Sequence, residues 1–290
     1  MLYLLLVSII WPFSFGLIKN QLSGLDPTAV AVVRIAFSLL IFLPLLRLRL
    51  VSRKHLVQLF VTGAVEFGVM YLLYLRAFHY LQAFEVALFT ITTPLYLALA
   101  DAIIAREWQP RHWIAATLSV VAASIIVWKK TPTDQFWYGF LLLQISNLCF
   151  AAGQLAYRRI RKSMTEVKDG QVFGWLYLGA LVATGLASCA TTNWTQFRPT
   201  FAQWEVLAYL GILSSGLCFF WWNRGSLKVN AGTLAAMNNA KVPLGVIVSL
   251  VFFHESQRLA TTDDLVRLAL GGVCLCVAVW IAESQRFFSR

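Results

Sequence analysis

The sequence is poor in charge and in the side chains that most often carry catalysis. Only 13% of its 290 residues are charged, whereas a soluble domain has about 25%. There are four histidines, and the five cysteines lie inside apolar segments with no CxxC pair among them. No Ser/His/Asp grouping and no metal-ligand spacing occurs. We therefore expect no disulfide framework, no metal site, no cofactor and no enzymatic activity.

Apolar residues fill most of the chain instead. They make up 59% of it and gather into ten segments, each long enough to cross a bilayer, for which about 20 residues are needed. The first segment lacks a basic n-region and a cleavage site, which favours a retained helix over a signal peptide. The sequence thus predicts an all-α polytopic membrane protein with ten transmembrane helices and no soluble domain. The expected spans are 2–18, 28–46, 56–78, 83–104, 112–128, 136–157, 171–190, 204–222, 231–253 and 265–283.

The net charge of +11 comes mainly from lysines and arginines in the loops between these segments. With the N-terminus inside, 15 basic residues fall on the cytoplasmic side and 6 on the outer side. Cytoplasmic loops of membrane proteins carry such an excess, so both termini are expected in the cytoplasm. The charge then reflects topology, and the expected environment is membrane lipid with no nucleic acid partner.

Two segments of the chain resemble each other. Leu75–Glu107 and Asn223–Glu255 each contain an arginine next to a small residue, then a short turn and an apolar span with a proline, Pro94 or Pro243. Each segment ends on a glutamate just past the span. One interpretation is an internal repeat; the other is that prolines simply kink many membrane helices.

A repeat at this spacing divides the chain into residues 1–130 and 131–290, with five spans in each half. Because five is odd, the halves would have opposite orientations in the membrane. Inverted repeats with interrupted helices at matching positions are typical of secondary transporters, whose site lies between the halves. We therefore expect two inverted five-helix repeats in one membrane unit.

The N-terminal residues Trp11–Phe15, followed by Lys19, Pro27 and Arg34, resemble the start of EamA-type members of the drug/metabolite transporter superfamily. Further runs resemble the biotin-uptake permeases of its carboxylate/amino acid/amine transporter group. These runs are Gly68–Leu81, Leu88–Tyr96, Phe136–Arg159, Phe173–Ala180 and Asn230–Gly245.

The resemblance implies a five-plus-five inverted fold in the bacterial cytoplasmic membrane and import of biotin by alternating access. The substrate would be biotin or a related carboxylate, and the chain would act as a monomer or weak homodimer. Proton coupling and energy-independent facilitation both remain open. The alternative function is a carrier or exporter of another carboxylate, an amino acid or an amine with the same fold.

Biotin has a carboxylate, an apolar thioether ring and a ureido group, so its site needs a cation, apolar walls and groups that both donate and accept hydrogen bonds. The sixth span places Gln144, Asn147 and Gln154 on one helical face. These amides predict contact with a ligand, with Asn147 as the first candidate. The alternative is hydrogen bonding between neighbouring helices.

The ninth span carries Asn238 and Lys241 three residues apart, and therefore on one face. Lys241 lies near the midplane of its span, and Glu66 lies near the middle of the third. Two interpretations compete: a buried structural ion pair, or a Lys241 that meets the substrate carboxylate while Glu66 is displaced or protonated.

Charged residues elsewhere in the spans have weaker signals. Arg76 and Glu85 flank the turn between the third and fourth spans, where they predict an ion pair; the alternative is an Arg76 that draws in the substrate carboxylate. Glu66 and Glu85 are the acidic groups best placed to take up a proton. Arg34 is expected to have a structural role, with ligand contact as the alternative.

Deep aromatic side chains are candidates for the walls around the thioether ring. Trp11 and Phe15 stand one helical turn apart in the first span, and Tyr71 and Tyr96 also lie well inside their spans. Tyrosine and tryptophan combine an apolar face with a polar group. Ordinary core packing is the competing interpretation for each of them.

Overall fold

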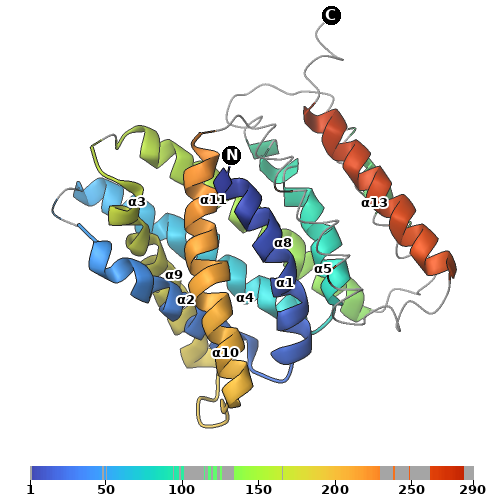
Figure 1. Ribbon diagram of the computed structural model, residues 1–290, viewed down its shortest axis with the longest axis horizontal. Helices are drawn as coiled ribbons and strands as arrows, with labels where there is room; N and C mark the ends of the chain where they lie inside the picture. The colour runs from blue at the N-terminus through green and yellow to red at the C-terminus, as the bar shows by residue number, and fades with distance from the viewer. Residues whose placement is uncertain are drawn as a thin grey trace, which may run out of the picture.

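The computed structural model describes residues 2–47, 49, 51–93, 95–97, 99–100, 134–164, 166–228 and 262–283, with isolated positions between 114 and 248. Within these ranges the protein is a bundle of helices with no strand (Figure 1). The prediction of an all-α protein is confirmed for this part of the chain. The described elements are α1 (Leu2–Gln21), α2 (Pro27–Phe42), η1 (Leu43–Leu45), α3 (Arg53–Gly63), η3 (Ala64–Val69), α4 (Met70–Ala77), α5 (Ala83–Phe89), η4 (Thr90–Thr92), α8 (Asp134–Lys162), α9 (Asp169–Thr191), α10 (Phe201–Tyr209), η5 (Leu210–Leu217), α11 (Cys218–Ser226) and α13 (Thr262–Glu283).

Six helices are long and apolar enough to cross a membrane, and each coincides with an expected span. They are Leu2–Gln21, Pro27–Leu45, Arg53–Ala77, Gln135–Lys162, Asp169–Thr191 and Phe201–Ser226. Helix α13 covers the expected tenth span, and it lies at one edge of the bundle (Figure 1). Most of the fifth and ninth expected spans fall outside the described residues, so the count of ten helices stays a prediction.

The outer faces of these helices are apolar. Ile9 on α1, Val61 on α3, Leu141 on α8 and Leu186 on α9 are all exposed. Apolar surface on this scale would be a liability in water, whereas the hydrocarbon core of a bilayer accepts it. The chain is therefore a multi-pass membrane protein.

Local sequence explains where the helices begin. The Asp26 carboxylate accepts a hydrogen bond from the Ala29 N–H at 2.7 Å, and Pro27 occupies the first position of α2. At the start of α10, the Thr200 N–H donates to Gln203 Oε1 at 2.9 Å and the Gln203 N–H donates to Thr200 Oγ1 at 3.3 Å. This reciprocal pair is a capping box, and it satisfies backbone donors at the membrane boundary.

Two of the long helices contain a π-helical segment near the middle, η3 between α3 and α4 and η5 between α10 and α11. The two similar segments of the sequence, Leu75–Glu107 and Asn223–Glu255, are offset by 148 residues. The same offset carries Gly63 onto Gly211 and Gly68 onto Gly216, within or beside the two π segments. π segments are rare and occur mostly at functional sites. Two of them at matching positions therefore mark these two helices as candidates for a functional role.

Each of these helices packs closely against a helix from the other half of the chain. A Cβ at Gly63 would overlap the backbone of Leu176 in α9, so α3 and α9 meet backbone to backbone. A Cβ at Gly211 would lie 2.6 Å from Phe37 Cβ and 3.1 Å from the Arg34 carbonyl in α2. Small residues permit such close approach of membrane helices. Helices α2 and α9 also contact one another, and the Arg34 side chain on α2 is buried.

Candidate functional site

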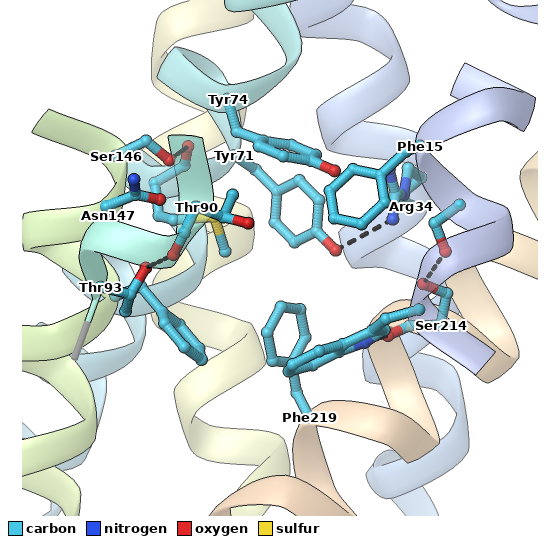
Figure 2. Close-up of a pocket in the computed structure, with 14 residues that line it drawn as sticks. Phe15, Arg34, Tyr71, Tyr74, Thr90, Thr93, Ser146, Asn147, Ser214 and Phe219 are labelled. Atoms are coloured by element: carbon cyan, nitrogen blue, oxygen red, sulfur yellow. Dashed lines mark hydrogen bonds between the residues drawn. The ribbon is translucent and has the colours of Figure 1, made fainter. Parts of the chain in front are cut away.

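A pocket lies where α1, α2, α4, η4, α8, η5 and α11 converge (Figure 2). It holds about 570 Å³ of space free of atoms, a figure that includes its open mouth. Sites for small ligands are concave and mostly apolar, with a few placed polar groups that fix the orientation of the ligand. The lining residues are Trp11, Ser14, Phe15, Arg34, Met70, Tyr71, Tyr74, Thr90, Thr93, Ser146, Asn147, Phe150, Ser214 and Phe219.

Arg34 supplies the positive charge of the pocket. Its side chain is only 1% exposed. Nη2 donates to the Tyr71 hydroxyl at 2.9 Å and to Ser215 Oγ at 3.0 Å, and Nε donates to Ser215 Oγ at 3.2 Å. The guanidinium also lies 4.6 Å from the centre of the Tyr71 ring, a cation–π distance. Nη1 has no hydrogen-bond partner among the described residues.

The π segment η5 presents the second-half side of the pocket. A π turn replaces i→i+4 bonds by i→i+5 bonds, and carbonyls of η5 accept bonds from side chains of other helices. Trp11 Nε1 donates to the Ser214 carbonyl at 3.0 Å, Ser38 donates to the Gly211 carbonyl at 2.8 Å, and Tyr177 donates to the Ser215 carbonyl at 2.6 Å. The segment is thus held from α1, α2 and α9 while its serines face neighbouring side chains.

A second polar group of side chains comes from α8 and the chain around η4. Asn147 Nδ2 donates to the Phe89 carbonyl and to Thr92 Oγ1, each at 3.2 Å. Its Oδ1 takes part in no hydrogen bond recorded within the described ranges and is available to a donor. Ser146 donates to the Met70 carbonyl at 2.9 Å. Figure 2 shows Ser146, Asn147, Thr90 and Thr93 on the side of the pocket opposite Arg34 and Ser214.

Aromatic rings separate the two polar sides. The Trp11 and Phe219 rings lie 5.1 Å apart, and the Phe150 and Phe219 rings lie 5.7 Å apart. Tyr71 and Tyr74 meet edge to face with a separation of 6.0 Å. Such walls suit a ligand with an apolar middle and polar ends.

Glu66 lies in the π segment η3 and is not part of the pocket lining. It is fully buried, and its Oε1 accepts a hydrogen bond from Asn223 Nδ2 at 2.9 Å. Its Oε2 has no hydrogen-bond partner in the described part of the chain. Gly153 leaves the room that Glu66 occupies, because a Cβ there would overlap Cβ of Glu66. The predicted partner Lys241 lies outside the described residues, so the pair remains a prediction.

The structure brings Trp11, Phe15, Tyr71 and Asn147 together in the lining of the pocket, while their predicted contact with a substrate stays a prediction. Gln144 lies behind Asn147: its Oε1 accepts from Thr92 Oγ1 at 2.7 Å and from the Tyr96 hydroxyl at 2.8 Å. Gln144 and Tyr96 are not among the lining residues, and Gln144 is connected to the lining through Thr92, which accepts a hydrogen bond from Asn147.

The remaining candidates lie away from the pocket lining. Gln154 and Asn238 are both about 1% exposed, and no described residue bonds to either amide atom of Gln154. Arg76 is exposed near the end of α4. Glu85 is buried in the first turn of α5, where its Oε2 accepts from the Gln82 N–H at 2.8 Å, a capping role. The Arg76–Glu85 ion pair and the ligand roles of these residues stay predictions.

Several lining residues were not singled out from the sequence. Ser214 and Tyr74 had no assigned role, and Arg34 was expected to be structural, with ligand contact as the alternative. For Arg34, the signal in the sequence was a charged residue within an apolar span, which by itself suggests a functional site. For Ser214, the signal was a pair of serines followed by a glycine in another apolar span.

Comparison with known proteins agrees with this architecture. Residues 1–128 match the EamA-like transporter family. The chain is 38% identical over 288 residues to a probable biotin transporter of Pseudomonas aeruginosa, covering 99% of this chain and 98% of that protein. It is 36% identical over 283 residues to a biotin transporter of Escherichia coli K12, covering 97% of this chain and 92% of that protein.

A third relative and a solved structure extend the comparison. A biotin transporter of Salmonella typhimurium is 37% identical over 257 residues, covering 88% of this chain and 85% of that protein. A crystal structure superposes with a TM-score of 0.71 at 16% identity, covering 99% of this chain and 97% of the other, which shows a shared fold. On the strength of the family match and of relatives that align over nearly its whole length, the chain belongs to the EamA-like transporter family.

Proposed function

We propose that the protein is a secondary transporter that imports biotin across the cytoplasmic membrane of a bacterium. The observation that carries the proposal is the pocket between the two halves of the chain, with polar groups on opposite sides and aromatic rings between them. The names of the relatives supply the candidate substrate. Both termini are cytoplasmic in this proposal, the carrier needs no cofactor, and it works as a monomer or weak homodimer.

The amide side of the pocket suits the ureido group of biotin. That group has two N–H donors and one carbonyl, and Asn147 offers a free Oδ1 to a donor. The hydroxyls of Ser146, Thr90 and Thr93 surround it, and each donates to a backbone carbonyl while retaining acceptor capacity. The rings of Trp11 and Phe219 then cover the apolar thioether part.

The matching π segments support two inverted halves, residues 1–130 and 131–290, with five helices in each. Gly63 of the first half packs on α9 of the second, and Gly211 of the second half packs on α2 of the first. A two-fold relation between halves of opposite orientation produces such reciprocal contacts. Residues from both parts of the chain line the pocket, which supports a site between the two halves.

Proton coupling is part of the proposal, and Glu66 is its site. Its carboxyl joins the third span of the first half to Asn223 in the third span of the second half. An unpaired carboxylate at this depth is costly, so binding and release of a proton there would change how the two halves hold together. Glu85, the other acidic candidate, is engaged in capping α5.

The test is uptake of labelled biotin into proteoliposomes that contain the purified protein, with and without a pH gradient. The proposal expects saturable uptake that a proton gradient, acidic outside, drives above equilibrium. Flux of other carboxylates but not of biotin would disprove the substrate while leaving a carrier. Binding of biotin with no flux under any gradient would disprove the carrier itself.

A further inference from the structure

The pocket contains a buried cation that has no anion among the described residues. A guanidinium has five N–H donors. The Nε and Nη2 groups of Arg34 bond to Tyr71 and Ser215, while Nη1 has no described partner. We propose that Arg34 binds the carboxylate of the transported substrate through Nη1, and so makes the pocket selective for organic carboxylates. This inference rests on the proposed transport of biotin by the same pocket.

Burial of the Arg34 guanidinium costs free energy unless an anion neutralises its charge. Removing a charge from water costs several kcal/mol even after relaxation, and Arg34 is 1% exposed. The ion pairs found among the described residues are Arg161–Asp169, Arg224–Asp169 and Arg267–Asp263, and none of them includes Arg34. Hydroxyls and the Tyr71 ring compensate the charge only in part, and an incoming carboxylate would compensate it fully.

The surroundings hold the guanidinium ready for an anion. Tyr71 from the first half and Ser215 from the second half bond to each other at 2.8 Å as well as to Arg34. Ser38, one turn further along α2, donates to the Arg34 carbonyl at 2.9 Å. A guanidinium held in place by bonds at Nε and Nη2 loses little entropy when its remaining donor group, Nη1, binds a carboxylate.

The location fits one end of an elongated ligand. Figure 2 shows Arg34 and Asn147 on opposite sides of the pocket, with Tyr71 between them. A substrate whose ureido end meets Asn147 would direct its carboxylate toward Arg34. This assigns to Arg34 the role for which the sequence also offered Lys241.

The experiment compares biotin with biotinamide, in which a neutral amide replaces the carboxylate, as competitors of labelled biotin on the full-length protein in proteoliposomes. The wild type should prefer biotin. Arg34→Met should weaken competition by biotin roughly tenfold to a hundredfold, because a hydrogen bond to a charged group contributes that much to the binding constant. Competition by biotinamide should stay unchanged. Arg34→Lys should keep part of the preference, because it retains the charge without the fork.

The competition experiment includes one control variant, Arg198→Met, and one further variant at the site, Ser215→Ala. Arg198→Met removes an exposed charge whose Nε donates to the Thr195 carbonyl at 3.3 Å, and it should behave as the wild type. Ser215→Ala leaves the charge in place but frees two of its donors, so it should lower the preference for biotin severalfold. If Arg34→Met is not recovered in folded form, Arg34→Lys and Ser215→Ala decide.

The outcomes separate this inference from the proposed function. A wild type that binds neither compound disproves the function. A wild type that binds both equally well overturns the inference and leaves the function standing. A full preference for biotin in Arg34→Lys and Ser215→Ala, with loss of that preference in Lys241→Met, also overturns it and assigns the carboxylate to Lys241.

Discussion

The close packing between the two halves predicts a large effect of adding one methyl group at Gly63. In Gly63→Ala the new Cβ would overlap the Leu176 carbonyl, carbon and Cα of α9. These are backbone atoms, so no rotamer change relieves the overlap and the two helices must separate. Overpacking of this kind typically costs about 1–3 kcal/mol.

A gain in helix propensity opposes this cost. Alanine is favoured over glycine by about 1 kcal/mol in a helix interior. The net expectation is a destabilisation of about 0–2 kcal/mol for Gly63→Ala, so this variant should be less stable than one in which the alanine meets no neighbour. Gly211→Ala should behave similarly, because its Cβ would lie 2.6 Å from Phe37 Cβ and 3.1 Å from the Arg34 carbonyl.

Gly185→Ala is the matched control. Gly185 lies in α9, the helix that Gly63 touches, and no described atom comes within 4 Å of an added Cβ. This variant should be as stable as the wild type or more stable by up to about 1 kcal/mol. Reversible unfolding of the purified protein in mixed micelles, followed by circular dichroism, measures all three variants. Equal stabilities of Gly63→Ala and Gly185→Ala would refute the backbone contact between α3 and α9.

Three further predictions concern the site and its support. Asn147→Ala should weaken biotin binding by about 1 kcal/mol, or roughly fivefold, in equilibrium binding to the purified protein; unchanged affinity would remove Asn147 from the site. Glu66→Gln should preserve the contact with Asn223 but abolish the response of biotin uptake to a pH gradient in proteoliposomes, whereas a normal response would show that Glu66 is not the coupling group. Tyr177→Phe removes the 2.6 Å bond to the Ser215 carbonyl and should lower stability in the same unfolding assay by about 1 kcal/mol, while no change would mean that η5 does not depend on that bond.

The helices themselves could be predicted well from the sequence. The run of apolar residues fixes the length of a span, and charged or capping residues such as Asp26 and Thr200 mark its ends. The π segments could not be predicted, because one extra residue per turn leaves the apolar composition of a span unchanged. Glycines at Gly63 and Gly211 were compatible with many roles, and only packing shows which backbone each one approaches.

The site was predicted only in part. The amide face of the sixth span does point inward, yet only Asn147 of the three amides lines the pocket, since the three stand at different depths along α8. Arg34 was expected to have a structural role, with ligand contact as the alternative. What distinguishes Arg34 is its set of tertiary contacts with Tyr71 and Ser215. These residues lie 37 and 181 positions away in the chain, so the sequence gives no sign that they meet Arg34.

The same contacts limit how the pocket can change access. Backbones touch at Gly63 and at Gly211, so the third span of each half has no gap in which to slide along the second span of the other. The contacts therefore oppose opening by translation of these spans along one another, and we expect helix bending to contribute. Membrane helices bend most readily where regular hydrogen bonding is interrupted, which in the described chain includes η3 and η5.

Glu66 lies in one of these segments and Ser215, bonded to Arg34, lies in the other. Binding of a proton and binding of a carboxylate would then each act directly on a point where a helix can bend.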